Sequence, residues 1–205
     1  MPRKYELLTF EYAELSDKAK KVALEEMRER ATQWDNSDQI TELFKEILGG
    51  CGYPTDDISW SLSCCQGDGV AFYGVIDTKT VINRLYADDP DKIAAIMKLW
   101  DTGLFDMKIV RNDFGHRYSH PNTMRVEMSE NAYDTDEGFQ LAESVAADIL
   151  AHVKDTSRVL EKTGYAEIAY FTEDSTLIDD AEANDIEFTV NGKIAKLQGA
   201  MEVKA

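Results

Sequence analysis

The sequence predicts an α+β fold in which helices flank a small antiparallel sheet of hairpins. Two observations predict it. Apolar residues recur at three- and four-residue steps in several long stretches, and at two-residue steps in shorter stretches between them. The chain has 205 residues, 43% of them hydrophobic, which allows a sizeable core. We expect a single domain over residues 1–205, with residues 135–205 able to form a separate acidic helical layer and a terminal hairpin.

Two helices are predicted in the first quarter of the chain. Ser16 supplies a capping hydroxyl and Asp17 a charge that suits the helix dipole, so the first helix is expected over residues 17–32. Apolar residues at helical spacing between 40 and 48 predict the second helix. We expect Gly49-Gly50 to end it, because glycine tolerates the left-handed backbone of a helix C-cap.

The period changes to two between residues 57 and 76. Alternating apolar residues on both sides of Gly67-Asp68-Gly69 predict a β-hairpin with a glycine-rich turn. A short helix is expected over residues 78–86. Asp89-Pro90 then provides a cap and a first-turn proline for a further helix, which we expect to end at Thr102-Gly103.

The second half of the chain predicts one strand pair, two helices and a hairpin. The strands are expected near residues 107–111 and 124–128. A long helix is predicted over residues 135–162, where apolar residues keep helical spacing. Thr172 is expected to cap a helix that runs through Ala183, and Asn191-Gly192 marks the turn of a small terminal hairpin.

Acidic residues are concentrated in one part of the chain. Residues 127–189 hold 17 of the 39 acidic residues and three of the 22 basic ones, and so carry −14 of the formal net charge of −17. Such a field repels nucleic acid and anionic membranes and favours basic partners. Charged residues opposite an apolar stripe are also typical of any solvated helix, so a surface without a partner remains the alternative.

The candidate partner-binding carboxylates are expected on the outer faces of the last two helices and on the strand after them. They are Glu137, Glu143, Asp148, Asp155, Asp174, Asp179, Asp180, Glu182 and Glu187. A solubilising surface normally mixes both signs of charge, whereas this stretch has little cationic compensation. Because like charges destabilise a fold, we expect these residues to serve a basic groove on another protein.

A second candidate site lies in the middle of the chain. Its residues would be Gln66, Asp68, Tyr118 and His120. Turn chemistry also explains Asp68, since aspartate in a tight turn bonds its own backbone. Cys64, Cys65, His116 and His120 offer the ligand types of a zinc centre or the groups of a small enzyme, but their spacing matches no specific motif. We therefore expect no metal, no cofactor and no catalysis.

The sequence also indicates a compartment. The start of the chain lacks the apolar run of a signal peptide, and no stretch approaches the roughly 18 apolar residues of a membrane-spanning helix. The three cysteines are an odd number for a disulfide framework, and adjacent Cys64 and Cys65 would point to opposite faces of a strand. We expect a cytoplasmic protein with reduced thiols.

Several short motifs resemble a known family. They are Leu8-Thr9-Phe10, Gln66-Gly67-Asp68-Gly69, Arg117-Tyr118-Ser119-His120 and Asn191-Gly192-Lys193. They resemble a family of mostly uncharacterised small phage and mobile-element proteins, some of which carry the label "antitoxin of toxin–antitoxin stability system". In that family an aromatic residue and a serine precede the Gln-Gly-Asp-Gly turn, where this chain has Cys64-Cys65. The resemblance implies no catalytic residues.

Three hypotheses follow. The leading one is a phage-type accessory protein whose acidic surface imitates nucleic acid and occupies the basic groove of a host defence or nucleic-acid-binding protein, without binding nucleic acid or membrane itself. The first alternative is an antitoxin that covers a toxin, with Gln66, Asp68, Tyr118 and His120 as the contact surface. The second alternative is a small enzyme or zinc protein that uses the cysteines and histidines.

Overall fold

The chain folds into helices around one small sheet. The computed structural model describes residues 8–33, 37–112, 120–128 and 136–195, and within them it has six α-helices and four strands. This confirms the predicted α+β class. Contacts divide the chain into two compact units: unit 1 comprises Met1–Asn36 and Ala166–Ala205, and unit 2 comprises Ser37–Tyr165. The acidic stretch 127–189 is therefore shared between the units. The single domain stays a prediction.

Unit 2 contains the sheet. Its strands are β1 (Asp57–Ser61), β2 (Gly69–Val75), β3 (Met107–Arg111) and β4 (Met124–Met128), in the order β1-β2-β3-β4 with antiparallel neighbours. The predicted hairpin is confirmed, with Trp60 opposite Val70. The predicted second pair is also confirmed, with Ile109 opposite Val126.

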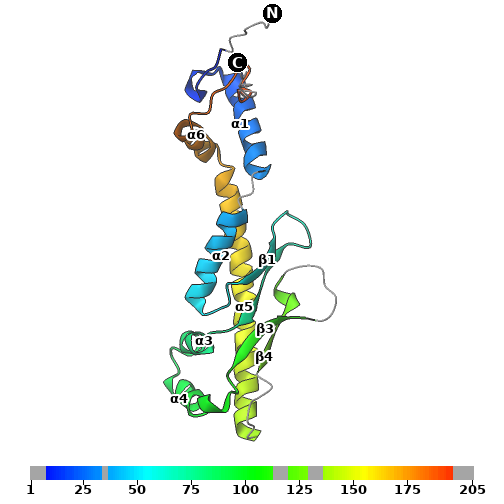
Figure 1. Cartoon of the computed structure of the whole chain (residues 1–205), viewed down its shortest axis with the longest axis vertical. Helices are drawn as coiled ribbons and strands as arrows, with labels where there is room; N and C mark the ends of the chain where they lie inside the picture. The colour runs from blue at the N-terminus through cyan, green and yellow to red at the C-terminus, as the bar shows by residue number, and fades with distance from the viewer. Residues whose placement is uncertain (1–7, 34–36, 113–119, 129–135, 196–205) are drawn as a thin grey trace, which may run out of the picture. The chain divides into compact units, whose positions relative to one another are not determined.

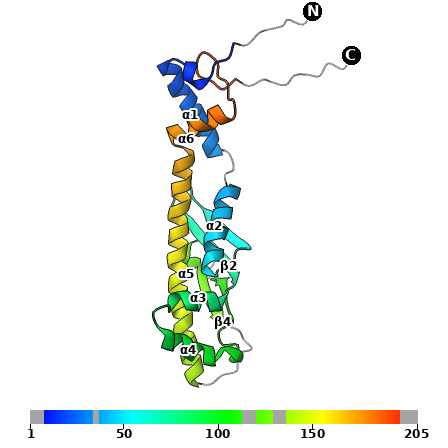
Figure 2. The ribbon, with the colours of Figure 1, turned by 90° about the vertical axis from the view of Figure 1, so that its left-hand side faces the viewer.

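Four helices accompany this sheet. They are α2 (Ser37–Cys51), α3 (Thr78–Leu85), α4 (Pro90–Lys98) and α5 (Asp136–Phe171), of which α5 continues into unit 1. Figures 1 and 2 show α5 alongside α2 and the sheet. The contact is close, because a Cβ added to Gly164 of α5 would lie 2.9 Å from Phe44 Cζ of α2. The Ser157 hydroxyl of α5 donates a buried hydrogen bond to the Val70 carbonyl of β2 at 2.5 Å.

Three predicted helix ends were wrong. Helix α4 ends at Lys98 and not at Thr102-Gly103, because a separate 3₁₀ turn, η2 (Trp100–Thr102), follows it. Helix α2 runs through Gly49-Gly50 to Cys51, and Gly52, at φ +83°, takes the left-handed position instead. The Tyr53 N–H then returns to the Leu48 carbonyl at 3.0 Å, which closes the helix end. Helix α5 continues beyond the predicted residue 162 to Phe171. The predicted cap Asp89 is confirmed, since its carboxylate accepts from the Lys92 N–H at 3.0 Å.

Unit 1 contains η1 (Tyr12–Glu14), α1 (Asp17–Gln33) and the whole of α6 (Asp174–Ala183). It also contains the last turns of α5. The predicted cap Ser16 is confirmed by its hydroxyl, which accepts from the Ala19 N–H at 3.3 Å. The predicted Thr172 cap was wrong: its hydroxyl donates back to the Ile168 carbonyl of α5 at 3.0 Å. The buried core of this unit consists of Leu15, Ala19, Ala23, Met27, Leu177, Ala181 and Phe188.

The two ends of the described chain meet in unit 1. Phe188 forms isolated antiparallel bridges with both Phe10 and Ile194, so the predicted terminal hairpin is present and gains a third segment. Gly192 turns this hairpin at φ +80°, and a Cβ there would lie 2.0 Å from the Ala19 carbonyl oxygen of α1. Only glycine fits this turn without displacing α1.

No helix in the described parts of the chain is both long enough and apolar enough to cross a membrane.

Candidate functional site

The strongest charge feature of unit 1 is a run without basic residues. Eight acidic residues and no basic residue lie between 163 and 192, all within the described chain. Helix α6 sits in the middle of this run. Leu177 and Ala181 of α6 are buried in the core of unit 1, whereas Asp179 and Glu182 are exposed. The helix therefore presents carboxylates to solvent along the face opposite its apolar one.

We call the exposed carboxylates of this region the α6 acidic surface. It consists of Glu11, Asp179, Asp180, Glu182, Asp185 and Glu187. Within the described residues none of these six forms an ion pair. Asp180 accepts a hydrogen bond from the Asn184 side-chain amide at 2.9 Å, which is neutral. The negative charge of this surface is therefore largely uncompensated by the fold itself.

Asp174, at the start of α6, differs from this surface. Its carboxylate pairs with the Arg28 guanidinium of α1. The same guanidinium donates through Nε to the Thr172 carbonyl at 3.2 Å. Asp174 thus holds the first turn of α6 against α1, and we assign it a structural contact.

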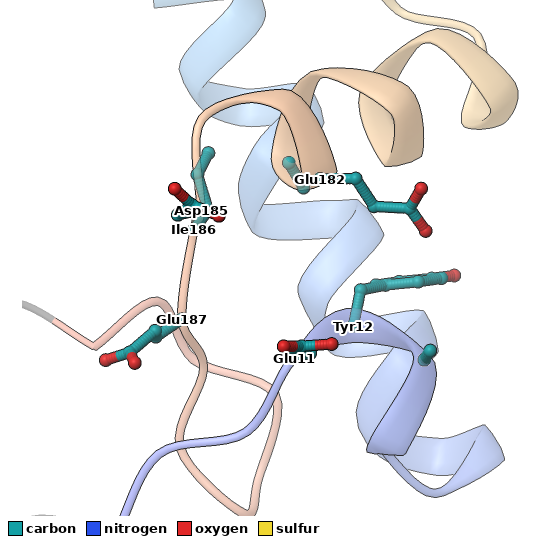
Figure 3. A pocket seen from close by; sticks show the side chains of 8 residues that line it. Glu11, Tyr12, Glu182, Asp185, Ile186 and Glu187 are labelled. Carbon is teal, nitrogen blue, oxygen red and sulfur yellow. The ribbon is translucent and has the colours of Figure 1, made fainter.

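A pocket of about 490 Å³ opens within the α6 acidic surface. Its lining residues are Glu11, Tyr12, Ala13, Ala181, Glu182, Asp185, Ile186 and Glu187. Figure 3 shows these side chains on the η1 turn, the end of α6 and the segment that follows it. The four acidic residues supply charge, and the alanines and Ile186 supply apolar contact area. This combination suits a lysine or arginine side chain, which has an apolar stem and a cationic head.

The Tyr12 ring forms one wall of the pocket and is fixed in place. It packs edge-on against Phe188, with ring centroids 6.2 Å apart. The Lys20 ammonium lies 5.7 Å from the centroid of the Tyr12 ring. Burial and the charge of Asp174 raise the pKa of the Tyr12 hydroxyl, so this group stays neutral near pH 7.

Two acidic residues of α5, Asp148 and Asp155, are bonded to partners within the fold. Asp148 accepts from the Tyr86 hydroxyl at 2.7 Å and from Lys92 Nζ at 3.1 Å. These contacts, with Tyr86 first, hold the pKa of the Asp148 carboxyl below its usual value. Asp155 pairs with Arg158 at 2.5 Å.

The remaining candidates on α5 do not join these two into a face. Glu143 is exposed, but it lies five residues before Asp148 and therefore roughly 140° away around the helix. The side chain of Glu137 lies outside the described residues. Helix α5 thus does not present Glu143, Asp148 and Asp155 as one continuous row of free carboxylates.

Asp68 of the proposed middle site acts within its own loop. Its carboxylate accepts from the backbone N–H groups of Ser63 and Cys65 at 2.8 and 2.9 Å, and from the Ser61 hydroxyl at 3.0 Å. The Tyr165 hydroxyl of α5 donates to the same carboxylate. These donors, Tyr165 first, hold the pKa of the Asp68 carboxyl well below its usual range, and the bond raises the pKa of Tyr165 to about 12.

The other residues of the middle site have separate surroundings. Gln66 is exposed at the tip of the β1–β2 loop. His120 precedes η3 (Pro121–Thr123), where its Nδ1 accepts from the Asn122 N–H at 3.0 Å. Tyr118 and His116 lie outside the described residues. No group of three or more His, Cys, Asp or Glu side chains in the described chain could hold a metal ion.

Comparison with known families places the chain in one of them. The family model of a domain of unknown function, DUF8835, matches residues 34–174. The chain belongs to this family. No curated protein and no solved structure matches the chain.

The DUF8835 match separates the two charge features. It contains all of unit 2, including the Asp68 loop and the compensated acids of α5. It ends at Asp174, so Asp179, Glu182 and Glu187 lie beyond it. The α6 acidic surface therefore belongs to the part of this chain that the DUF8835 model does not match.

Sequence reasoning missed two polar contacts within the DUF8835 region. Tyr165 was not singled out, although its hydroxyl reaches Asp68 across 97 residues of sequence. Buried Tyr53 was also missed; its hydroxyl and His152 Nδ1 of α5 share a hydrogen bond of 2.5 Å. Neither contact has a local signal, because each joins residues far apart along the chain. The sequence placed His152 on the predicted helix over residues 135–162, but Tyr165 lies beyond the predicted end of that helix.

Proposed function

We propose that this protein acts by binding, and that the α6 acidic surface docks onto a basic surface of a partner protein. The observation that carries the proposal is the set of exposed carboxylates in unit 1 without an ion pair among the described residues. A surface of one charge sign steers an oppositely charged partner and strengthens the encounter at low salt.

The pocket supports the same proposal. A flat acidic surface attracts any cation, whereas a concave one can also enclose a side chain and remove apolar area from water. The pocket offers Tyr12, Ala181 and Ile186 for such contact, and four carboxylates also line it. A lysine or arginine of the partner fits this chemistry, with the charged head at the rim and the stem inside.

The partner classes we propose share a basic surface. Proteins that bind nucleic acid carry positive grooves that neutralise phosphates. An acidic protein that occupies such a groove competes with nucleic acid, which is the action of a counter-defence inhibitor of phage type. A toxin that acts on nucleic acid offers the same chemistry to an antitoxin. The resemblance to phage and mobile-element proteins supports both classes.

The test is a capture experiment from a host lysate with three versions of the full chain. The first is the wild type. The second carries Asp179→Lys, Glu182→Lys and Glu187→Lys in the α6 acidic surface. The third carries Glu46→Lys, Asp101→Lys and Glu143→Lys, which are exposed acids of unit 2, and so has the same net charge as the second. Each capture is run at low and at high salt, and with duplex DNA as competitor.

We expect the wild type and the unit 2 control to retain the same partner at low salt and to release it at high salt or with DNA. The α6 variant should not retain it. Equal loss in both lysine variants would show that only net charge matters. Retention by the α6 variant would remove this surface as the docking site.

A further inference from the structure

The tip of the β1–β2 loop presents two neighbouring thiols to solvent. Strand β1 ends at Ser61 and β2 begins at Gly69, so Cys64 and Cys65 lie in the connection and not on a strand. Both side chains are exposed, whereas Cys51 of α2 is half-buried. The alternation that would place the two cysteines on opposite faces therefore does not apply.

The backbone of this tip is held by groups outside the cysteine side chains. Cys64 has φ +59°, a left-handed conformation that is uncommon for a residue with a side chain. Its N–H donates to the Tyr165 hydroxyl at 3.2 Å, and the N–H of Cys65 donates to Asp68 at 2.9 Å. Tyr165 and Asp68 are themselves bonded to each other. The fold thus fixes a turn that exposes two adjacent thiols, with Ser63 and Gln66 exposed on either side of them.

The two thiols have different surroundings. The Cys65 thiol donates to Asp68 Oδ1 at 3.2 Å and lies 3.4 Å from the Ser63 hydroxyl. Only the protonated thiol can make the bond to Asp68. The Cys64 thiol makes no hydrogen bond within the described residues. Cys64 is therefore the sulfur that is free to attack another molecule, and Cys65 is the second sulfur, which can then attack Cys64.

We propose that Cys64 and Cys65 form a redox-active dithiol that reacts with small-molecule disulfides. The Cys64 thiolate attacks one sulfur of the small disulfide, forms a mixed disulfide and expels the first small thiolate, which takes up a proton. Cys65 loses its proton to water and attacks the Cys64 sulfur, which closes the Cys64–Cys65 disulfide and expels the second small thiol. One protein dithiol is oxidised by two electrons, and one small disulfide is reduced to two thiols.

Adjacency decides both the rate and the reversibility of this step. The second thiol is one residue away, so closure is intramolecular and outruns the attack of a second small disulfide. Consecutive Cα atoms are about 3.8 Å apart, less than the roughly 4.4–6.8 Å that most disulfides span. The closed ring is therefore strained and returns readily to the dithiol. Closure also removes the Cys65 S–H donor from Asp68.

The test uses the full chain with Cys51→Ser, so that only the two tip cysteines remain. The folded protein is exposed to oxidised glutathione, quenched with an alkylating agent and measured by intact mass. We expect a species that is lighter than the dithiol by two hydrogen atoms and carries no alkyl group. A low concentration of a monothiol should restore both alkylation sites.

Two further variants separate the roles of the sulfurs. With Cys65→Ser added, the mixed disulfide cannot be resolved, so one glutathione should remain attached. With Cys64→Ser added, the adduct should form at least several-fold more slowly. Circular dichroism of each variant checks that the fold is kept. Stable attachment of two glutathiones to the Cys51→Ser protein, a disulfide-linked dimer, or no reaction would each overturn the proposal.

Discussion

Unit 1 and unit 2 carry negative charge in different ways. In unit 2 two acidic residues of α5 are bonded within the fold, Asp148 to Tyr86 and Lys92, and Asp155 to Arg158. In unit 1 the carboxylates of the α6 acidic surface form no ion pair within the described residues. The density of acidic residues along a sequence therefore does not locate a binding surface. The bonded partners of each carboxylate in the fold show which negative charges are left uncompensated.

The two units also differ in what holds them together. Unit 2 is built on β2, where Val70 to Tyr73 are all buried, and on the apolar stripe of α5. Unit 1 has a smaller core in which Phe188 is the largest fully buried side chain. It also depends on close backbone contact at Gly192. Unit 1 thus has the smaller core to oppose repulsion among the carboxylates of the α6 acidic surface.

The largest effects should come from truncating the central aromatic ring of each unit. Phe188→Ala and Phe44→Ala each remove a fully buried ring and should lower the free energy of unfolding by about 3–5 kcal/mol. Hydrogen exchange shows where protection is lost. We expect Phe188→Ala to expose amides of α1 and α6, and Phe44→Ala to expose amides of α2 and β1. Leu8→Ala, at a side chain 74% exposed, is the control. Identical exchange maps for the two variants would remove the distinction between the units.

A smaller loss is expected at the hairpin turn of unit 1. Gly192→Ala places a methyl group 2.0 Å from the Ala19 carbonyl and requires a left-handed backbone. The strain and overpacking together should cost roughly 2–5 kcal/mol, measured by denaturant unfolding.

Gly50→Ala is the matched change in unit 2. Gly50 lies in α2 with nothing within 4 Å of the added methyl group, so the variant should gain up to about 1 kcal/mol from helix propensity. Destabilisation by Gly50→Ala, or no effect of Gly192→Ala, would contradict these contacts.

Acid should destabilise unit 2 through His152. Burial, followed by the charge of Arg84, lowers the pKa of this imidazole, whose Nδ1 shares a hydrogen bond of 2.5 Å with the Tyr53 hydroxyl. The folded state therefore prefers neutral His152. Below the unfolded pKa of about 6.5 the unfolded chain binds the proton more readily, so this contribution is present at pH 7 and lost as the pH falls toward 5.

The melting temperature between pH 7 and pH 5 measures this effect. His152→Gln keeps a hydrogen-bond acceptor near Tyr53 without titrating in this range, so its pH dependence should be weaker. Unit 1 contains none of the three histidines of the chain and should lack this dependence. An unchanged pH profile in His152→Gln would show that other groups control it.

The smallest effects concern exposed charges and should have opposite signs in the two units. Glu182→Lys places a cation three residues after Asp179 on α6 and should stabilise unit 1 by about 0.2–0.5 kcal/mol. Asp155→Lys removes the contact with Arg158 on α5 and should destabilise unit 2 by a similar amount. Thermal unfolding of both variants measures the difference. The same sign in both would mean that the carboxylates of the two units are in equivalent surroundings.

Most elements of the fold could be predicted because they depend on local patterns. Alternation located β1 and β2, and Asp89-Pro90 located the start of α4. Helix ends were less predictable. Gly49-Gly50 did not end α2, because a glycine stops a helix only where the chain takes the left-handed conformation, and Gly52 does so here.

The candidate site was less predictable because charge partners are set by tertiary structure. Nothing near Asp148 in the sequence indicates Lys92, which is 56 residues away. The bridge between Phe10 and Phe188 joins segments far apart in the sequence, next to the pocket residues Glu11 and Glu187, and it also lacks a local signal. The sequence shows where the acidic residues lie along the chain, but only the fold shows which of them have bonded partners.

Hydrogen–deuterium exchange of the chain, alone and in complex with the captured partner, tests the α6 acidic surface most directly as the docking site. We expect new protection in α6 and in the segment from Asp185 to Glu187, with the amides of α5 in unit 2 unchanged. Protection confined to residues 37–165 would contradict this expectation.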